Sequence, residues 1–108
     1  MERLLLVEDD PTLIRMLTSF LTTENLQVTS VTGQSAAVEA MEASKPDLAL
    51  VDISLAEGNG FAVCARAKEL SVRSVGFQTK DIYGIMIYES VPIRSVSFLH
   101  PKLPTCLL

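Results

Sequence analysis

Two groups of acidic side chains stand directly after apolar runs in this sequence. Glu8, Asp9 and Asp10 follow the run LLLV, and Asp52 follows the run LALV. Acids at one strand end can be a plain solvated charge run. If the two runs are neighbouring strands, however, their acids meet, and clustered carboxylates repel until a proton or a cation neutralises them. An all-oxygen ligand set favours Mg²⁺ or Ca²⁺ over zinc.

Asp52 is also a candidate nucleophile. A site of two or three carboxylates with open positions suits Mg²⁺ in particular, because this ion retains water and binds phosphate oxygens. A carboxylate beside Mg²⁺ can attack a phosphoryl group and form an aspartyl phosphate. That reaction asks mainly for positioning and charge neutralisation. The residues therefore predict a cation site that could support phosphoryl transfer.

The elements that must position these acids follow from hydrophobic periodicity. Apolar residues predict strands at 3–7, at 26–31, centred on 48–51 and at 74–79, with helices at about 11–24, 32–44 and 61–70. This alternation implies a parallel sheet with helices on both faces and right-handed crossovers. The first and third strands are the most apolar, so we expect them to be central neighbours whose acids face each other.

Composition bounds the class of protein. The chain has 108 residues, of which 48% are hydrophobic and 20% charged, and this predicts one globular domain over 1–108. The net charge of −4 gives no electrostatic reason to bind nucleic acid or an anionic membrane. No apolar run approaches the roughly 20 residues that span a bilayer, and the N-terminal run is too short for a signal peptide. We therefore expect a cytoplasmic protein without nucleic-acid or membrane partners.

The acidic motifs also carry a family resemblance. The segments LLLVEDDPTLIRMLTSFL and KPDLALVDISLAEGNGF resemble the receiver domain of bacterial two-component response regulators, with the correct interval between them. The resemblance implies an α/β fold, a doubly wound, flavodoxin-like parallel sheet of five strands in the order 2-1-3-4-5. It implies that Glu8 and Asp9 hold Mg²⁺, Glu8 partly through water, and that Asp52 is both ligand and phosphoacceptor. The Ser54 main-chain oxygen would be a further ligand, and Asp10 would only cap the first helix.

Two further residues of the family's site are expected later in the chain. A Ser or Thr at the end of the fourth strand hydrogen-bonds the phosphoryl group, and Thr79 takes that place. A Lys at the end of the fifth strand, usually followed by Pro, pairs with the same group, but here the order is Pro101-Lys102. Either His100 occupies the lysine position or the strand has slipped by one residue. We favour Lys102, because its flexible stem tolerates a small shift.

The resemblance weakens towards the C-terminus. Residues 1–79 follow the family pattern closely, whereas 80–108 diverge, with room for a short helix at 82–89 and a strand at 94–99 but not for the last helix. Residues 1–70 hold 11 acids and 5 bases, and residues 71–108 hold 2 acids and 4 bases. This shift suggests a truncated or altered C-terminus. A sheet that lacks one covering helix would expose apolar faces of its first and third strands, so we expect a homodimer or a swapped oligomer.

The resemblance implies a signalling function and not an enzyme. The chain would take a phosphoryl group from a histidine kinase onto Asp52 with Mg²⁺, and the added charge would draw Thr79 inward. An output domain or an effector protein would respond to that change. The alternative is a phosphorylation-incompetent, receiver-like protein-binding module. A Mg²⁺-dependent phosphatase is disfavoured, because such enzymes carry a second acid two residues after the nucleophile, where this chain has Ser54.

Overall fold

The computed structural model describes residues 2–77, in which strands and helices alternate. In chain order the elements are β1 (Glu2–Val7), α1 (Pro11–Thr23), β2 (Leu26–Val31), α2 (Gln34–Ala43), β3 (Leu48–Asp52), α3 (Gly60–Glu69) and β4 (Arg73–Phe77). Each of them corresponds to an element that the periodicity predicts. The helix predicted at 82–89 and the strand predicted at 94–99 lie outside the described residues, as does any last helix.

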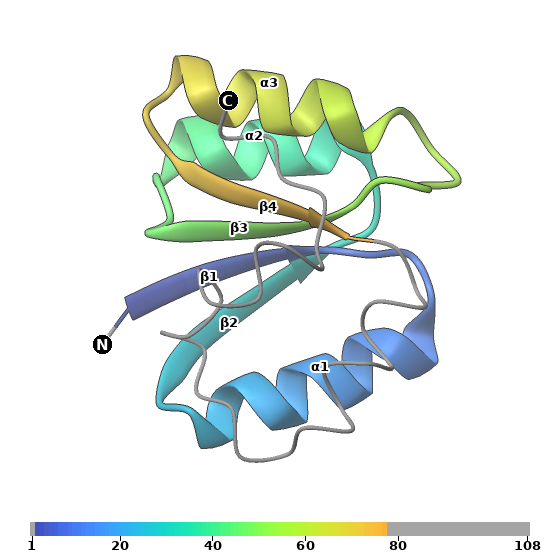
Figure 1. The fold of residues 1–108 in the computed structure, drawn as a ribbon, viewed down its shortest axis with the longest axis vertical. Coiled ribbons are helices and arrows are strands. Elements are labelled where there is room, and N and C mark those ends of the chain that lie inside the picture. Colours follow the sequence, from blue (N-terminus) through green and yellow to red (C-terminus); the bar gives the residue numbers. More distant parts are fainter. Residues whose placement is uncertain (1, 78–108) are drawn as a thin grey trace.

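The four strands form one parallel sheet in the order β2-β1-β3-β4 (Figure 1). This confirms the predicted order for these strands and the central position of β1 and β3. Val7 at the end of β1 is paired with Val51 of β3. Because the paired strands run in the same direction and end at the same level, Glu8 and Asp52 emerge together at the carboxyl edge of the sheet.

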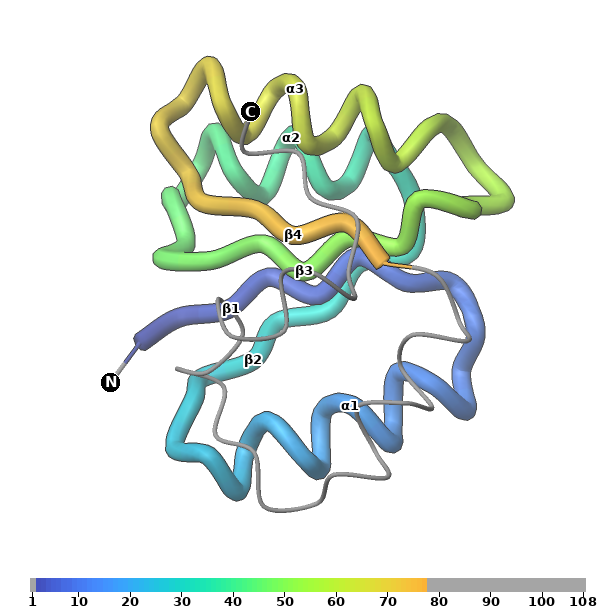
Figure 2. The backbone as a smooth tube through the Cα atoms, in the orientation of Figure 1, coloured from blue at the N-terminus to red at the C-terminus, as the bar shows by residue number. Residues whose placement is uncertain are grey.

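Helices cover both faces of this sheet, with α1 on one face and α2 and α3 on the other (Figures 1 and 2). Successive side chains of a strand point to opposite faces. Leu4 and Leu6 of β1 therefore pack with the α1 leucines Leu13, Leu17 and Leu21. Leu5 and Val7 pack on the other face, where the helices contribute Ala37, Met41, Val63, Cys64 and Ala67. The two-sided burial explains why β1 and β3 are apolar without alternation.

The predicted exposure of the first and third strands is wrong. Leu4, Leu6 and Leu50 are 1%, 0% and 4% exposed, and Leu5 and Val51 on the opposite face are buried as well. Leu4, Leu6 and Leu50 belong to one buried cluster with the leucines of α1, and Leu5 and Val51 belong to another with apolar residues of α2 and α3. Exposure of these strands therefore gives no support to self-association, which stays a prediction.

Local signals at the ends of α1 are also as predicted. Asp10 is the N-cap, and its Oδ1 accepts hydrogen bonds from the main-chain N–H groups of Thr12 and Leu13 at 2.8 and 3.3 Å. Pro11 occupies the first helical position, where a missing N–H costs nothing. Asn25 after the helix has a φ of +64°, the left-handed conformation that Asn tolerates. Among residues 2–77, none of the helices has the length and apolar character needed to cross a bilayer.

Candidate functional site

Three carboxylates meet at the carboxyl edge of the sheet. Glu8 and Asp9 follow β1, Asp52 ends β3, and one carboxylate oxygen of each lies within 4.8 Å of the others. Glu8 and Asp52 are only 1% and 3% exposed, whereas Asp9 is half-buried. Residues 44 positions apart in the chain are thus brought together by the parallel pairing of β1 with β3. We call these three residues the acidic cluster.

Glu8 is the most constrained member of the acidic cluster. Its Oε1 accepts hydrogen bonds from the main-chain N–H groups of Asp9 and Asp10 at 3.1 and 3.0 Å. Its Oε2 is buried and has no hydrogen-bond partner in the described part of the chain. The pKa of Glu8 is raised from its ordinary value of 4.5 to about 7, mainly because the carboxyl group is buried. The hydrogen bond from the Asp10 N–H lowers this pKa, and the negative charge of Asp52 raises it. The buried oxygen is therefore one that a proton or a cation would satisfy.

Main-chain N–H groups of the segment after β3 orient the other two acids. Asp52 Oδ1 accepts from the N–H of Ser54 at 2.8 Å. Asp9 Oδ2 accepts from the N–H of Ala56 at 3.1 Å. Ser54 therefore lies beside the acidic cluster, and its expected role as a metal ligand stays a prediction. Asp10 caps α1 instead of joining the cluster, which agrees with the role expected for it.

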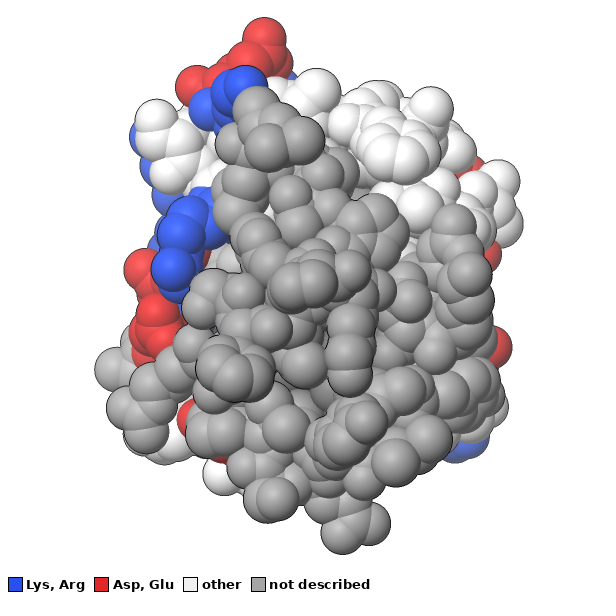
Figure 3. Space-filling model, in the orientation of Figure 1, with Lys and Arg blue, Asp and Glu red and all other residues white. Residues whose placement is uncertain are grey.

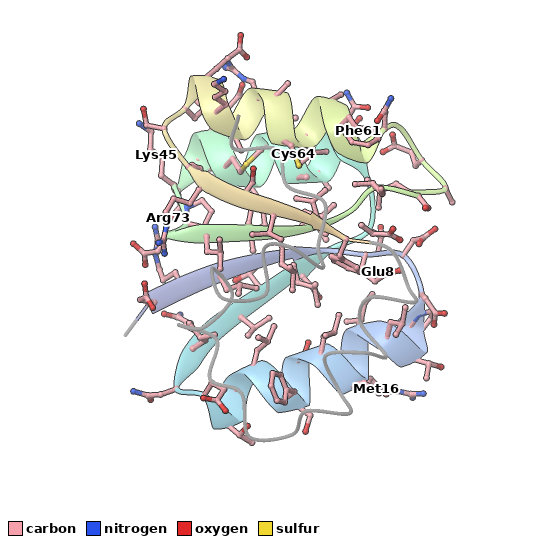
Figure 4. The ribbon with its side chains drawn as sticks, in the orientation of Figure 1. Glu8, Met16, Lys45, Phe61, Cys64 and Arg73 are labelled. Atoms are coloured by element: carbon pink, nitrogen blue, oxygen red, sulfur yellow. The ribbon has the colours of Figure 1, made fainter. Side chains whose placement is uncertain are left out.

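Two basic side chains, those of Lys45 and Arg73, lie away from the acidic cluster (Figure 4). Glu8 lies at one end of the sheet, and Lys45 and Arg73 lie at the opposite end (Figure 4). In the face shown in Figure 3, most of the visible Lys and Arg atoms lie along the left edge of the molecule. The ion pairs within residues 2–77 include Arg66–Glu42, Arg66–Glu69 and Arg73–Glu2. None of these three ion pairs includes a residue of the acidic cluster.

The start of α3 fits closely against the end of β3. A Cβ on Gly60 would collide with the main-chain oxygen of Asp52 and would lie 2.6 Å from the Cα of Ile53. Only glycine allows this approach, which brings the N-terminus of α3 directly behind Asp52. Apolar periodicity does not indicate this contact. The glycine directly before the predicted third helix is the signal that could have indicated it.

The remaining predicted site residues cannot be placed. Thr79, Lys102 and His100 lie outside the described residues, so the structure does not test whether they approach Asp52. What the described residues do provide is an all-oxygen donor set that includes one orphaned, buried carboxylate oxygen. This arrangement fits a hard divalent cation, for which oxygen is the preferred ligand.

Comparison with known families now identifies the domain. A family model of the response regulator receiver domain matches residues 4–82. The chain belongs to this family. Receiver domains are signalling domains, and this receiver domain carries an acidic cluster that could bind a metal ion.

Named relatives are similar over the same part of the chain. The DNA-binding response regulator MtrA of Mycolicibacterium smegmatis is 40% identical over 63 residues, which are 58% of this chain and 28% of that protein. The heme response regulator HssR of Staphylococcus epidermidis is 32% identical over 65 residues, 60% of this chain and 29% of that protein. The receiver domain thus spans less than a third of the length of these curated relatives.

Solved structures support the fold. The receiver domain of the sensor histidine kinase PA1611 from Pseudomonas aeruginosa, which has a magnesium ion coordinated in its active-site cleft, superposes with a TM-score of 0.67 at 23% identity. The matched region covers 71% of this chain and 66% of that one. A CheY-like receiver domain protein from Methanospirillum hungatei gives a TM-score of 0.69 at 22% identity, covering 72% and 64% of the two chains.

Proposed function

We propose that this receiver domain accepts a phosphoryl group on Asp52, with Mg²⁺ bound by Glu8, Asp9 and Asp52. The observation that carries the proposal is the acidic cluster with its orphaned, buried Glu8 Oε2. The family and the magnesium-bound receiver domain of PA1611 add support. We assign the Ser54 main-chain oxygen as a further ligand, because the bond from the Ser54 N–H to Asp52 Oδ1 holds this residue beside the acidic cluster.

In the proposed reaction a carboxylate oxygen of Asp52 attacks the phosphorus of a phosphohistidine. The new O–P bond forms as the N–P bond breaks, and the imidazole nitrogen keeps the electron pair. Bound Mg²⁺ would neutralise charge on the phosphoryl oxygens. The Ser54 N–H fixes the rotation of the Asp52 carboxylate. Because Asp52 is buried at the sheet edge, few water molecules compete for its oxygens. These residues supply the positioning on which phosphoryl transfer mainly depends.

The partner and the response belong to the same proposal. The phosphodonor would be a histidine kinase, and an output domain or effector would respond to the phosphorylated surface. Thr79 would hydrogen-bond the phosphoryl group and Lys102 would pair with it, with His100 the alternative for the second role. The relatives support an output domain or effector, because the matched region is only 28% and 29% of their length and most of each relative lies outside it.

The test is the intact mass of the protein after incubation with acetyl phosphate and Mg²⁺. We expect one added phosphoryl group, lost in chelator and in Asp52→Asn. This variant keeps an oxygen for the Ser54 N–H bond, so the fold should survive. The matched control is Asp10→Asn, which preserves the α1 cap because Asn is an equally good N-cap. It should be phosphorylated normally.

The opposite result would also be informative. A folded protein that binds Mg²⁺ but gains no phosphoryl group would overturn the proposal. The phosphorylation-incompetent binding module would then become the better description of this chain. Phosphorylation that persists in Asp52→Asn would place the acceptor on another residue.

A further inference from the structure

The segment that connects β3 to α3 is fastened to the first residue of α2 by two reciprocal hydrogen bonds. The main-chain N–H of Gln34 donates to the carbonyl oxygen of Glu57 at 3.2 Å. In return, the side-chain Oε1 of Gln34 accepts from the main-chain N–H of Asn59 at 2.9 Å. The start of α2 and the segment between β3 and α3 lie at the same end of the sheet (Figure 2). We call this pair of bonds the Gln34 clasp.

Two glycines allow the clasp to close. Gly58 has a φ of +85°, and a Cβ there would collide with the side chain of Gln34. A Cβ on Gly33 would collide with the carboxylate of Glu57. A side chain on Gly58 would therefore strain the backbone and collide with Gln34, whereas one on Gly33 would require the Glu57 side chain to move. This close fit argues that the contact is specific and not a chance approach of two surface loops.

The clasp lies one residue away from a hydrogen bond to the acidic cluster. Ala56 precedes Glu57, and its N–H is the donor that holds Asp9 Oδ2 at 3.1 Å. Ser54, whose N–H holds Asp52 Oδ1, belongs to the same segment. Residues 56–59 are exposed and contribute little to either core cluster. The clasp is therefore one restraint on this segment, beside the bond from the Ser35 N–H to Glu57 Oε1 at 3.4 Å and the packing of Leu55 against the core.

We propose that Gln34 is a positioning residue for the metal centre. It acts through the 54–59 segment, which it holds so that Ala56 keeps Asp9 turned toward Glu8 and Asp52. Loss of the Oε1 acceptor leaves the Asn59 N–H without this partner and loosens the segment, so Asp9 samples orientations that do not bind the cation. The inference rests on the proposed function only in taking Mg²⁺ as the cation.

A purely structural role for Gln34 predicts a different result. Gln34 is the first residue of α2, and its N-cap, Gly33, makes no side-chain capping bond. If the clasp only supports this helix end, its loss would lower stability and leave Mg²⁺ affinity unchanged. If it positions Asp9, Mg²⁺ affinity falls even under conditions where the variant is fully folded. The two roles are therefore separated by cation affinity and not by stability.

The experiment uses the full chain and three variants. Gln34→Ala removes the acceptor, Gln34→Glu keeps an acceptor oxygen at the same place, and Gln27→Ala makes the same chemical change at an exposed position of β2. Mg²⁺ affinity is measured by calorimetric titration. Exchange of the Ala56 and Asn59 amides is measured by NMR in chelator, and the rate of phosphorylation by acetyl phosphate is measured at saturating Mg²⁺.

For Gln34→Ala we expect affinity for Mg²⁺ about tenfold weaker, the lower end of the loss seen when outer partners of metal ligands are removed. Faster exchange at Ala56 and Asn59 should accompany it, while the rate at saturating Mg²⁺ stays near that of the wild type. Gln34→Glu should restore the affinity and Gln27→Ala should keep it. Wild-type affinity in Gln34→Ala, or an equal loss in Gln27→Ala, would overturn the inference alone. A wild-type protein that binds no Mg²⁺ would overturn the proposed function as well.

Discussion

Asp9 Oδ2 accepts a hydrogen bond from the main-chain N–H of Ala56 at 3.1 Å, although the two residues lie 47 positions apart in the sequence. The bond joins the end of β1 to the segment after β3. One edge of the acidic cluster is therefore set by the backbone of a loop and not by another side chain. A substitution of Asp9 that preserves this bond can therefore separate the structural role of Asp9 from its role in cation binding.

Asp9→Asn should weaken Mg²⁺ binding without unfolding the protein. The Asn oxygen can still accept from Ala56, but the cluster loses one negative charge and a carboxylate oxygen. Since even outer partners of metal ligands are worth about tenfold or more in affinity, we expect at least that loss in a calorimetric titration. Asp10→Asn, the neighbouring change outside the cluster, should leave the affinity unchanged. Equal affinities in the two variants would remove Asp9 from the ligand set.

Glu8 should make the metal-free protein less stable as the pH rises. Its pKa is raised by burial from 4.5 to about 7 in the folded state. A raised pKa means that the folded state binds the proton more tightly than the unfolded state. The stabilisation is fully present below pH 4.5 and is lost as the pH rises through about 7. The loss is at most about 3.5 kcal/mol, given about 1.4 kcal/mol for each pKa unit.

Urea denaturation in chelator at acidic and mildly alkaline pH measures this effect. Glu8→Gln mimics the neutral acid, so its free energy of unfolding should exceed that of the wild type at alkaline pH and match it at acidic pH. Glu39→Gln, at an exposed position of α2, is the control and should follow the wild-type profile. Mg²⁺ should raise the alkaline stability of the wild type, because it binds only the folded state. A wild-type profile in Glu8→Gln would contradict the assigned pKa.

Gly60→Ala should lower both stability and Mg²⁺ affinity. The added Cβ would meet the main-chain oxygen of Asp52, which belongs to backbone and cannot turn aside. We expect a loss of about 1–3 kcal/mol, as in other overpacked sites, together with weaker Mg²⁺ binding because Asp52 is displaced. Ala65→Gly, an exposed change in the same helix, costs about 1 kcal/mol through helix propensity. Ala65→Gly should leave the Mg²⁺ affinity unchanged. A loss of Mg²⁺ affinity in Ala65→Gly would mean that the loss in Gly60→Ala does not arise from its contact with Asp52.

The sequence by itself determined the four strands and three helices of residues 2–77, and with them the meeting of Glu8 and Asp52. The reason is that apolar periodicity and local caps such as Asp10 are properties of short segments. Parallel pairing of the two most apolar strands then puts their terminal acids at one edge. The candidate ligands could therefore be named before any coordinates were known.

Only the tertiary structure decided how those ligands are held. The Ala56 and Ser54 N–H bonds, the orphaned oxygen of Glu8 and the Gln34 clasp all depend on loop conformations. Such conformations arise from contacts between segments distant in the chain, and periodicity carries no signal for them. The burial of β1 and β3 was also decided at this level, because it depends on how closely the helices pack. The sequence predicted the participants in the site, and packing between distant segments set their orientation and their protonation.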